Sequence, residues 1–307
     1  MHEIKKNSIE STPFFSIIVP TYNCADLLRR SLLSVSMQTF QDFEIIVIDN
    51  SSSDHTSQVI KSIKNSALSK YTIQNEGIIA RSRNLAIQKA QGRWLAFLDA
   101  DDVWLPRKLE VVHDIILKNS DIIGVCHDEW KIVNGAKEKR LHYKPSKPDL
   151  YEFLLFHGNC LSPSATVVRK DVAKNIGGFS TKEDFITVED YEFWIRLSRE
   201  GKIYFSDEVL GEYHIHSKNA SGKLDAHAHA LIAVGEYHLN LWFQENPFSQ
   251  MKYRKGKGKI MTIASRILLK GKSFEQAQKT VAQALKSNPL SWKAWAILLL
   301  IKLRIAV

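Results

Sequence analysis

The first third of the chain alternates short, continuous apolar runs with segments whose apolar residues recur at helical spacing. Continuous apolar runs bounded by polar residues or proline are typical of strands buried on both faces of a parallel sheet. They predict strands at residues 15–20, 43–48, 71–73 and 93–98, and the helical spacing predicts helices at residues 26–37, 56–64 and 79–90. This order predicts an α/β fold, with a mostly parallel sheet and helices on both faces.

The rest of the chain has a less regular pattern. We expect strands at residues 121–130, 164–169 and 203–205, a loop or hairpin at 131–148, and a helix at 188–200. From about residue 224 the spacing is helical to the end, with a break expected at the basic segment 253–259. A separate helical region should therefore follow the α/β part.

Polar residues gather where the predicted strands end. The clusters are Pro20, Thr21, Tyr22 and Asn23 after the first strand, Asp49 and Asn50 after the second, and Asp99, Ala100, Asp101 and Asp102 after the fourth. Open α/β sheets bind their ligands outside the carboxyl ends of the strands. We therefore expect the functional site at this edge of the sheet.

The acidic cluster carries the clearest chemistry. Asp99, Asp101 and Asp102 are three carboxylates within four residues, and they repel one another unless a cation offsets their charge. Such oxygen ligands suit Mg²⁺ or Mn²⁺, which can also bridge a substrate diphosphate. An acidic loop or helix N-cap before Val103 is the alternative, but the position directly after a buried strand favours a metal.

Composition limits the classes of protein that need to be considered. Among 307 residues, 44% are hydrophobic and 24% charged, as in a soluble globular protein. The net charge of +9 favours a polyanionic partner such as a nucleic acid, a membrane surface or a phosphorylated ligand. Three scattered cysteines argue against a disulfide framework. No GxGxxG follows the first strand and no nucleic-acid-reading motif is present, so we expect neither a Rossmann dehydrogenase nor nucleic-acid binding.

Targeting signals are absent from the pattern. The polar N-terminus has no apolar signal region, and the apolar run at 292–307 is short and interrupted by charge. We expect a cytoplasmic protein, peripheral on the inner face of the cytoplasmic membrane if it contacts a membrane at all.

Six strings occur in order along the chain: FSIIVPTYN, QTFQDFEIIVIDNSSSD, RNLAIQKAQGRWLAFLDADDVW, GGF, VEDYEFWIRL and YHIHSKNAS. Together they resemble the large family 2 of inverting nucleotide-sugar glycosyltransferases, which have the Rossmann-like GT-A fold. The resemblance implies a flexible lead-in at 1–13, a GT-A domain at 14–221 and a helical region at 222–307. Within the GT-A domain it implies a donor half at about 14–104 and an acceptor half at about 105–221.

The resemblance also implies a donor site. The residues it assigns to donor binding are Pro20, Thr21, Tyr22, Asn23, Asp49, Asn50, Arg81, Arg83, Asn84, Asp99, Ala100 and Asp101. Many relatives have a second acid where this chain has Asn50, so the identity of the base, which we expect to be uracil, is less constrained. Arg83 is favoured over Arg81 as the contact to the diphosphate, because in the family a basic residue just before this asparagine, here Asn84, reaches towards the donor site. Guanidinium groups suit phosphate oxygens.

The remaining roles implied by the resemblance concern catalysis. Asp190, paired with Glu189, resembles the catalytic base, and Trp194 lies in the acceptor segment. Asp101 resembles the direct metal ligand, with Asp99 and His216 beside it, for Mn²⁺ or Mg²⁺. A carboxylate base is needed because a sugar hydroxyl is a poor nucleophile, whereas acids at a helix N-terminus alone would only favour the helix.

These assignments predict an inverting glycosyltransferase of the hexosyl or N-acetylhexosaminyl type. It would use a nucleotide-sugar donor, expected to be a UDP-sugar, and a glycan or glycolipid acceptor in cell-surface polysaccharide or lipid-linked glycan synthesis. The alternative is a catalytically inactive scaffold that binds a sugar nucleotide. The segment 274–300 resembles a helix pair of the tetratricopeptide kind; with the basic residues at 252–259 it suits a peripheral membrane contact, and a cap on the catalytic domain or a homodimer contact is the alternative.

Overall fold

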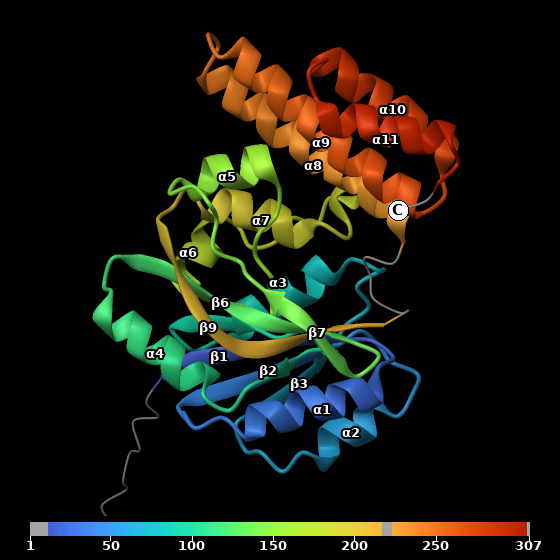
Figure 1. Ribbon diagram of the computed structural model, residues 1–307. Helices are drawn as coiled ribbons and strands as arrows, with labels where there is room; N and C mark the ends of the chain where they lie inside the picture. The colour runs from blue at the N-terminus through green and yellow to red at the C-terminus, as the bar shows by residue number, and fades with distance from the viewer. Residues whose placement is uncertain (1–11, 217–222, 306–307) are drawn as a thin grey trace, which may run out of the picture.

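The computed structural model describes residues 12–216 and 223–305. Residues 1–11, most of the expected lead-in, lie outside this range. The described chain forms one mixed sheet with helices on both faces and a group of four helices, α8 to α11, stacked on the side of α5 and α7 (Figure 1). The predicted α/β class is confirmed.

The first half of the sheet is parallel, as the apolar runs predict. Its strands run in the order β3-β2-β1-β4. They are β1 (Phe15–Thr21), β2 (Phe43–Asp49), β3 (Leu68–Thr72) and β4 (Trp94–Phe97). The connecting helices are α1 (Ala25–Ser36), α2 (Thr56–Ser62) and α3 (Ile79–Lys89).

Beyond β4 the sheet becomes mixed. It continues as β8-β6-β9-β5, with β7 pairing to β6; β6 and β9 run parallel, and the other pairs in this half are antiparallel. The strands are β5 (Val103–Trp104), β6 (Ile122–Val133), β7 (Ala136–Leu141), β8 (Thr166–Arg169) and β9 (Lys202–Ile215). The helices are α4 (Lys108–Lys118), α5 (Leu150–His157), α6 (Lys170–Asn175), the short η1 (Glu183–Phe185) and α7 (Glu189–Leu197).

Each face of the sheet has its own apolar core, because successive side chains of a strand point to opposite faces. On β1, Ile17 and Val19 pack with α1, α2 and α4, whereas Ile18 packs with α3, α6 and α7. A strand buried on both faces is mostly apolar, which is why the continuous runs predicted β1, β2 and β4. β3 is only partly buried, and it begins at Leu68, three residues before the predicted strand at 71–73.

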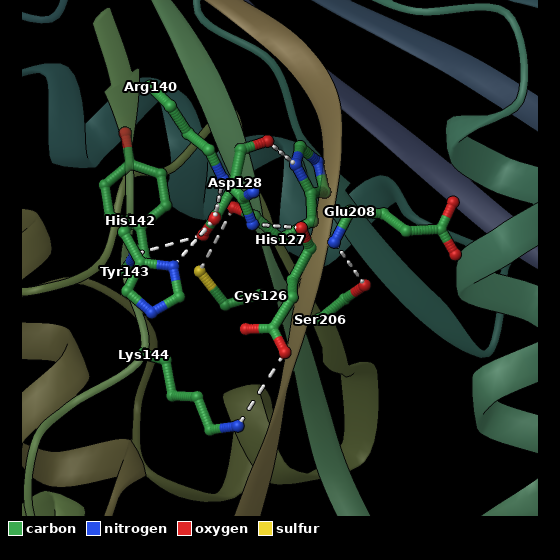
Figure 2. Close-up of polar contacts among 10 residues, drawn as sticks. Cys126, His127, Asp128, Arg140, His142, Tyr143, Lys144, Ser206 and Glu208 are labelled. Carbon is green, nitrogen blue, oxygen red and sulfur yellow. Dashed lines mark hydrogen bonds and ion pairs between the residues drawn. The ribbon is translucent and has the colours of Figure 1, made fainter.

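The β6–β7 hairpin is held by a buried carboxylate. Asp128 is 1% exposed, and its two oxygens contact Arg140 Nε at 2.6 Å, His142 Nδ1 at 2.8 Å and the backbone N–H of Tyr143 at 3.1 Å (Figure 2). Several partners are needed because a buried charge without them is strongly unfavourable. Asp128 therefore fixes β7 and the segment that follows it against β6.

The helical region consists of α8 (Leu224–Glu245), α9 (Gln250–Lys270), α10 (Phe274–Ser287) and α11 (Trp292–Lys302). The break expected at 253–259 is wrong, because α9 runs through it. A Cβ added at Gly256 would lie 2.8 Å from the Phe156 ring, and one at Gly258 would lie 2.8 Å from Asn288 Cβ. The two glycines allow neighbouring elements to approach the helix closely, so they do not end it. No helix in the described part of the chain is long and apolar enough to cross a membrane.

The close contact at Gly258 gives a test of this packing. Glycine to alanine in an exposed helix normally stabilises it by up to about 1 kcal/mol. At Gly258 the added methyl group also meets the Ala284 carbonyl at 3.1 Å and the Asn288 amide at 3.3 Å, so we expect Gly258→Ala to reduce the free energy of unfolding by about 1–3 kcal/mol. Denaturant unfolding followed by circular dichroism measures this change. Lys255→Ala, an exposed change on the same helix, is the control; a Gly258→Ala protein more stable than the wild type would contradict the packing.

Candidate active site

The polar clusters predicted at the strand ends do lie together. β1 and β2 are in register up to Thr21 and Asp49, and β4 pairs with the other side of β1. After β1 the backbone turns at Asn23, which has a φ of 46°. Asn23 Oδ1 accepts a hydrogen bond from the Ser53 N–H at 2.8 Å, and Ser52 Oγ accepts one from the Asn23 N–H at 3.0 Å. These bonds join the loops after β1 and β2 into one surface.

On this surface Asp49 is buried, and its carboxylate has partners in Lys70 and Ser52. Its carboxylate lies 2.9 Å from Lys70 Nζ and accepts the Ser52 N–H at 3.0 Å. Burial opposes its ionisation, but the contacts with Ser52 and Lys70 outweigh it and lower its pKa. Asn50 Oδ1 accepts the Asn75 N–H at 2.7 Å. The ring of Tyr22, in contrast, is 58% exposed beside these groups and open to stack on a planar ligand.

Pro20 and Thr21 are buried at the end of β1. Their side chains thus support this surface, and Thr21 Oγ1 lies 3.1 Å from Cys24 Sγ. Ala100, within the acidic loop, is likewise buried, with 7% exposure. Because the side chains of Pro20, Thr21 and Ala100 are buried, we expect any direct contact with a donor to come from their backbone atoms.

Arg83 joins three elements of the site. Its side chain, 3% exposed, extends from α3 and donates to Glu189 Oε1 at 2.7 Å and to Asp99 Oδ1 at 2.8 Å. Burial disfavours its charge, but Asp99 and Glu189 more than compensate and raise the pKa of the guanidinium. Both terminal nitrogens bind carboxylates, one from the acidic loop and one from α7, and the contact of Arg83 with a diphosphate stays a prediction.

Three more side chains predicted to bind a ligand, those of Arg81, Asn84 and Trp194, make other contacts. Arg81 pairs with Glu76 at the surface. The side chain of Asn84 bonds the backbone N–H and C=O of Phe179, each at 2.8 Å, so it fixes the turn before that residue. Trp194 has 0% exposure and packs edge-on against the Phe97 and Phe179 rings. Its indole lies in the core, which gives the side chain a packing role, and its part in acceptor binding stays a prediction.

Asp101 and His216 meet at the edge of the site. His216 Nε2 lies 3.0 Å from Asp101 Oδ2, and both side chains are about one-quarter exposed. Burial and the neighbouring Asp99 raise the pKa of Asp101, and His216 partly offsets them. Asp99 is turned towards Arg83. Within residues 12–216 and 223–305 no group of three or more acidic, histidine or cysteine side chains is arranged to hold a metal.

Asp102, which the sequence analysis placed in the acidic cluster without assigning it a separate role, has a structural one. It is 1% exposed, and it accepts hydrogen bonds from Ser164 Oγ at 2.6 Å and from the His214 N–H at 3.0 Å. Burial and the nearby acids, Asp101 first, raise its pKa well above the usual range. Asp102 thus fixes the last residues of β9, just before His216, against the acidic loop. Its position in the acidic cluster pointed to this residue, but no sequence pattern indicated its partners, Ser164 and His214.

Asp190 lies on the opposite side of Arg83 from the acidic loop, in the first turn of α7. Burial and the adjacent Glu189 raise the pKa of Asp190 to about 7, and Arg83 partly opposes them. Asn159 Nδ2 lies 3.3 Å from Asp190 Oδ2; nothing in the sequence pattern pointed to this asparagine. A carboxyl group with a pKa near neutrality, partly accessible, is suited to accept a proton from a substrate hydroxyl.

Known proteins with this sequence pattern and fold are glycosyltransferases. The sequence model of the family "Glycosyl transferase family 2" matches residues 16–177, more than half of the chain. The chain is 31% identical over 188 residues to UDP-Glc:alpha-D-GlcNAc-diphosphoundecaprenol beta-1,3-glucosyltransferase WfgD of Escherichia coli, covering 61% of this chain and 71% of the relative. It is 28% identical over 285 residues to the uncharacterized glycosyltransferase RP339 of Rickettsia prowazekii, covering 90% and 81%.

Solved structures share the fold at low identity. TarS 1-349 of S. aureus in complex with UDP-GlcNAc superposes with a TM-score of 0.63 at 18% identity, covering 95% of this chain and 92% of that one. The mannosyltransferase PcManGT of Pyrobaculum calidifontis, in complex with GDP-Man and Mn²⁺, gives a TM-score of 0.59 at 16% identity, covering 94% and 79%. These likenesses confirm the GT-A fold, and with the family match they identify the chain as a glycosyltransferase that belongs to glycosyl transferase family 2.

Proposed function

We propose that this glycosyltransferase moves a sugar from a UDP-sugar to a hydroxyl of a lipid-linked glycan, with inversion and with a divalent cation. The observation that carries the proposal is Asp190, whose pKa of about 7 suits a general base at neutral pH. Arg83 binds Asp99 of the acidic loop and Glu189, the residue directly before Asp190, so one side chain links the proposed base to the donor side of the site.

The reaction needs one base and one stabilised leaving group. The Asp190 carboxylate takes the proton of the acceptor hydroxyl while that oxygen bonds to the anomeric carbon, and the bond from this carbon to the diphosphate breaks. A single displacement inverts the anomeric centre, and no second protein carboxylate is needed as a nucleophile. Glu189 is less suited to be the base, because one of its oxygens is held by Arg83 and its side chain is 9% exposed.

The residues at the acidic loop fit a divalent cation. Asp101 and His216 converge, and Mg²⁺ or Mn²⁺ sites commonly combine one or two protein ligands with substrate phosphates and water. The raised pKa of Asp101 reflects negative charge that a cation would offset. When bound, the cation would neutralise charge developing on the departing diphosphate. Asp101 and His216 would hold it, with Asp99 kept beside them by Arg83.

The proposed identities of the donor and the acceptor rest on the surface formed by the loops after β1 and β2 and on the relatives. Exposed Tyr22 beside Asp49 and Asn50 suits a nucleotide base, and TarS binds UDP-GlcNAc. WfgD acts on a sugar joined to a diphosphoundecaprenol. These relatives support a hexosyl or N-acetylhexosaminyl donor and a polyprenol-linked acceptor for this chain.

A donor panel tests the proposal. The purified protein is incubated with Mn²⁺, a lipid-diphosphate-linked GlcNAc acceptor and UDP-Glc, UDP-GlcNAc, UDP-Gal or GDP-Man in turn. Products are detected by mass spectrometry, and the configuration of the new bond is read by NMR. We expect transfer from one UDP-sugar with inversion. Tight binding of a UDP-sugar without transfer to a broad set of acceptors would favour the inactive scaffold instead.

Asp190→Asn tests the base. The amide keeps the shape but cannot accept the proton, so we expect kcat to fall by about 100- to 10,000-fold with donor affinity nearly unchanged. Because the folded protein raises the pKa of Asp190, its charge destabilises the fold at pH 8, and the variant should be at least as stable as the wild type. Kinetics, donor titration and thermal unfolding check this. Asp184→Asn, an exposed acid on η1, is the control; normal turnover by Asp190→Asn would move the base elsewhere.

The pH profile gives a second test of the same group. Only the ionised form of Asp190 accepts a proton, and with a pKa of about 7 about 10% is ionised at pH 6 and about 90% at pH 8. We expect kcat/KM to rise through pH 7 and level off above pH 8. In Asp190→Asn the residual activity should lose this rise. A profile flat from pH 5 to pH 8 in the wild type would be inconsistent with this base.

Asp101→Asn tests the cation. Loss of one carboxylate from the pair with His216 should weaken donor binding in the presence of Mn²⁺ and lower kcat/KM by about 100-fold or more. Wild-type activity should disappear with a chelator and return when Mn²⁺ or Mg²⁺ is added. Asp114→Asn, an exposed acid on α4, serves as the control. Full wild-type activity in the chelator would exclude the cation.

A further inference from the structure

The positive charge of the protein is confined to one end of the chain. Residues 246–307 contain 13 lysines and arginines and one acid, Glu275, for a net charge of +12. The preceding 245 residues contain 29 basic and 32 acidic residues, a net charge of −3. The helical region after α8 is therefore strongly cationic, whereas the catalytic domain is not.

Within this region α11 is apolar on two opposite sides. Ala294, Ile297 and Ile301 are buried against the neighbouring helices. The other side carries large apolar side chains spaced three or four residues apart, so that they lie on one face. These residues, which we call the α11 outer face, are Trp292, Trp295, Leu299 and Leu303, with exposures of 72%, 54%, 58% and 59%. An amphipathic surface helix would carry polar groups there.

Basic side chains and further apolar residues adjoin the α11 outer face. Lys293, Lys302 and Arg304 are exposed along or just after the helix, and Leu290, in the turn before it, is 92% exposed. Arg254 of α9 donates to the Lys286 carbonyl at 3.2 Å, which places the basic start of α9 beside the same turn. Tryptophan and leucine surrounded by lysine and arginine is the pattern of a helix that lies in a bilayer interface.

The charge decides between partners. A second copy would bring the same cationic surface against itself, and like charges facing each other oppose association. A nucleic acid would match the charge but would leave the aliphatic Leu299 and Leu303 without a function. An anionic bilayer matches both features, because lipid headgroups pair with the basic residues and the interface accepts the apolar side chains.

The helical region is attached to the acceptor side of the active site. In the first turn of α8, His227 Nδ1 lies 3.1 Å from Thr187 Oγ1, two residues before Glu189. Ala228 of the same turn belongs to the apolar cluster that contains Ile297 and Ile301 of α11. α11 packs on α9 and α10, and α9 packs along α8, whose first turn contacts the segment leading to Asp190. α9 and α8 therefore join α11 to the acceptor side.

We propose that the α11 outer face, with Lys293, Lys302 and Arg304, binds the headgroup region of an anionic lipid bilayer. Bound in this way, the protein keeps the acceptor side of its site near the surface that contains a lipid-linked acceptor. This purpose rests on the proposed function, but the binding itself needs neither donor nor acceptor, so it can be tested separately.

The test uses the full chain and vesicles of phosphatidylcholine with or without phosphatidylglycerol. We expect the wild type to sediment with the anionic vesicles at low salt and to be released as salt rises. Lys293→Glu/Lys302→Glu should weaken this binding by about 25-fold or more, since each basic residue contributes about fivefold. Trp292→Ser/Leu299→Ser should weaken it at every salt concentration, because it removes the apolar contact. Thermal unfolding confirms that each variant is folded.

Leu117→Ser/Lys118→Glu provides the matched control, since it removes an exposed leucine and reverses a lysine charge on α4 of the catalytic domain. It should bind vesicles as the wild type does. The proposal is overturned if both α11 variants bind like this control, or if the wild type does not bind anionic vesicles. It is also overturned if sedimentation velocity shows a wild-type dimer that Trp292→Ser/Leu299→Ser dissociates, which would make the face a contact between copies. Sugar transfer to a water-soluble acceptor should be unchanged in all three variants, so a failure here is distinguishable from a failure of the proposed reaction.

Discussion

The ion pairs of Arg83 with Asp99 and Glu189 are the constraint on which the active site depends. The guanidinium is buried, and its two terminal nitrogens hold carboxylates from the end of β4 and the start of α7 at 2.8 and 2.7 Å. A buried charge whose partner is removed costs several kcal/mol, so none of the three groups can move alone. Because Asp190 follows Glu189 directly, this contact also restricts the position of Asp190, the proposed base, relative to the acidic loop. These ion pairs thus add to the apolar core that the first half of the sheet shares with α6 and α7, and they fix α7 against the end of β4.

Arg83 does not neutralise the whole site. Asp101, Asp102 and Asp190 all have raised pKa values, in each case first because of burial and then because of neighbouring acids. An acid whose pKa is raised by folding destabilises the protein at pH values above it, so this arrangement lowers stability at the pH where the enzyme works. Surplus negative charge at a site that must receive a diphosphate is unfavourable unless a cation accompanies the donor. In the proposed reaction a divalent ion bound with the donor would offset this charge.

The sequence pattern predicted the buried strands and the edge of the sheet at which the polar clusters lie. It could not predict which polar side chains pair with one another. β1, β2 and β4 were predicted because strands buried on both faces are mostly apolar, whereas the bounds of the partly buried β3 were missed. The polar clusters at the strand ends indicated the candidate site. The ion pairs of Arg83 join residues 16 and 106 positions apart, which no local pattern records. Asn84 and Trp194 look like site residues in sequence, but only the packing shows that one fixes Phe179 and the other fills the core.

In the helical region, too, the local sequence pattern does not show the tertiary contacts that decide the structure. Two glycines among lysines look like a break, yet Gly256 and Gly258 lie inside α9 where Phe156 and Asn288 approach it. The cost of glycine in a helix is an intrinsic preference of about 1 kcal/mol, and close tertiary packing can exceed it. The lysines around these glycines have a separate consequence. Lys252 pairs with Glu152 of α5, and Lys257 lies 2.8 Å from Glu236 of α8, so these two lysines bind α9 to neighbouring helices, one of them in the catalytic domain. A segment whose sequence predicted a break is thus a continuous helix whose lysines add to its tertiary contacts.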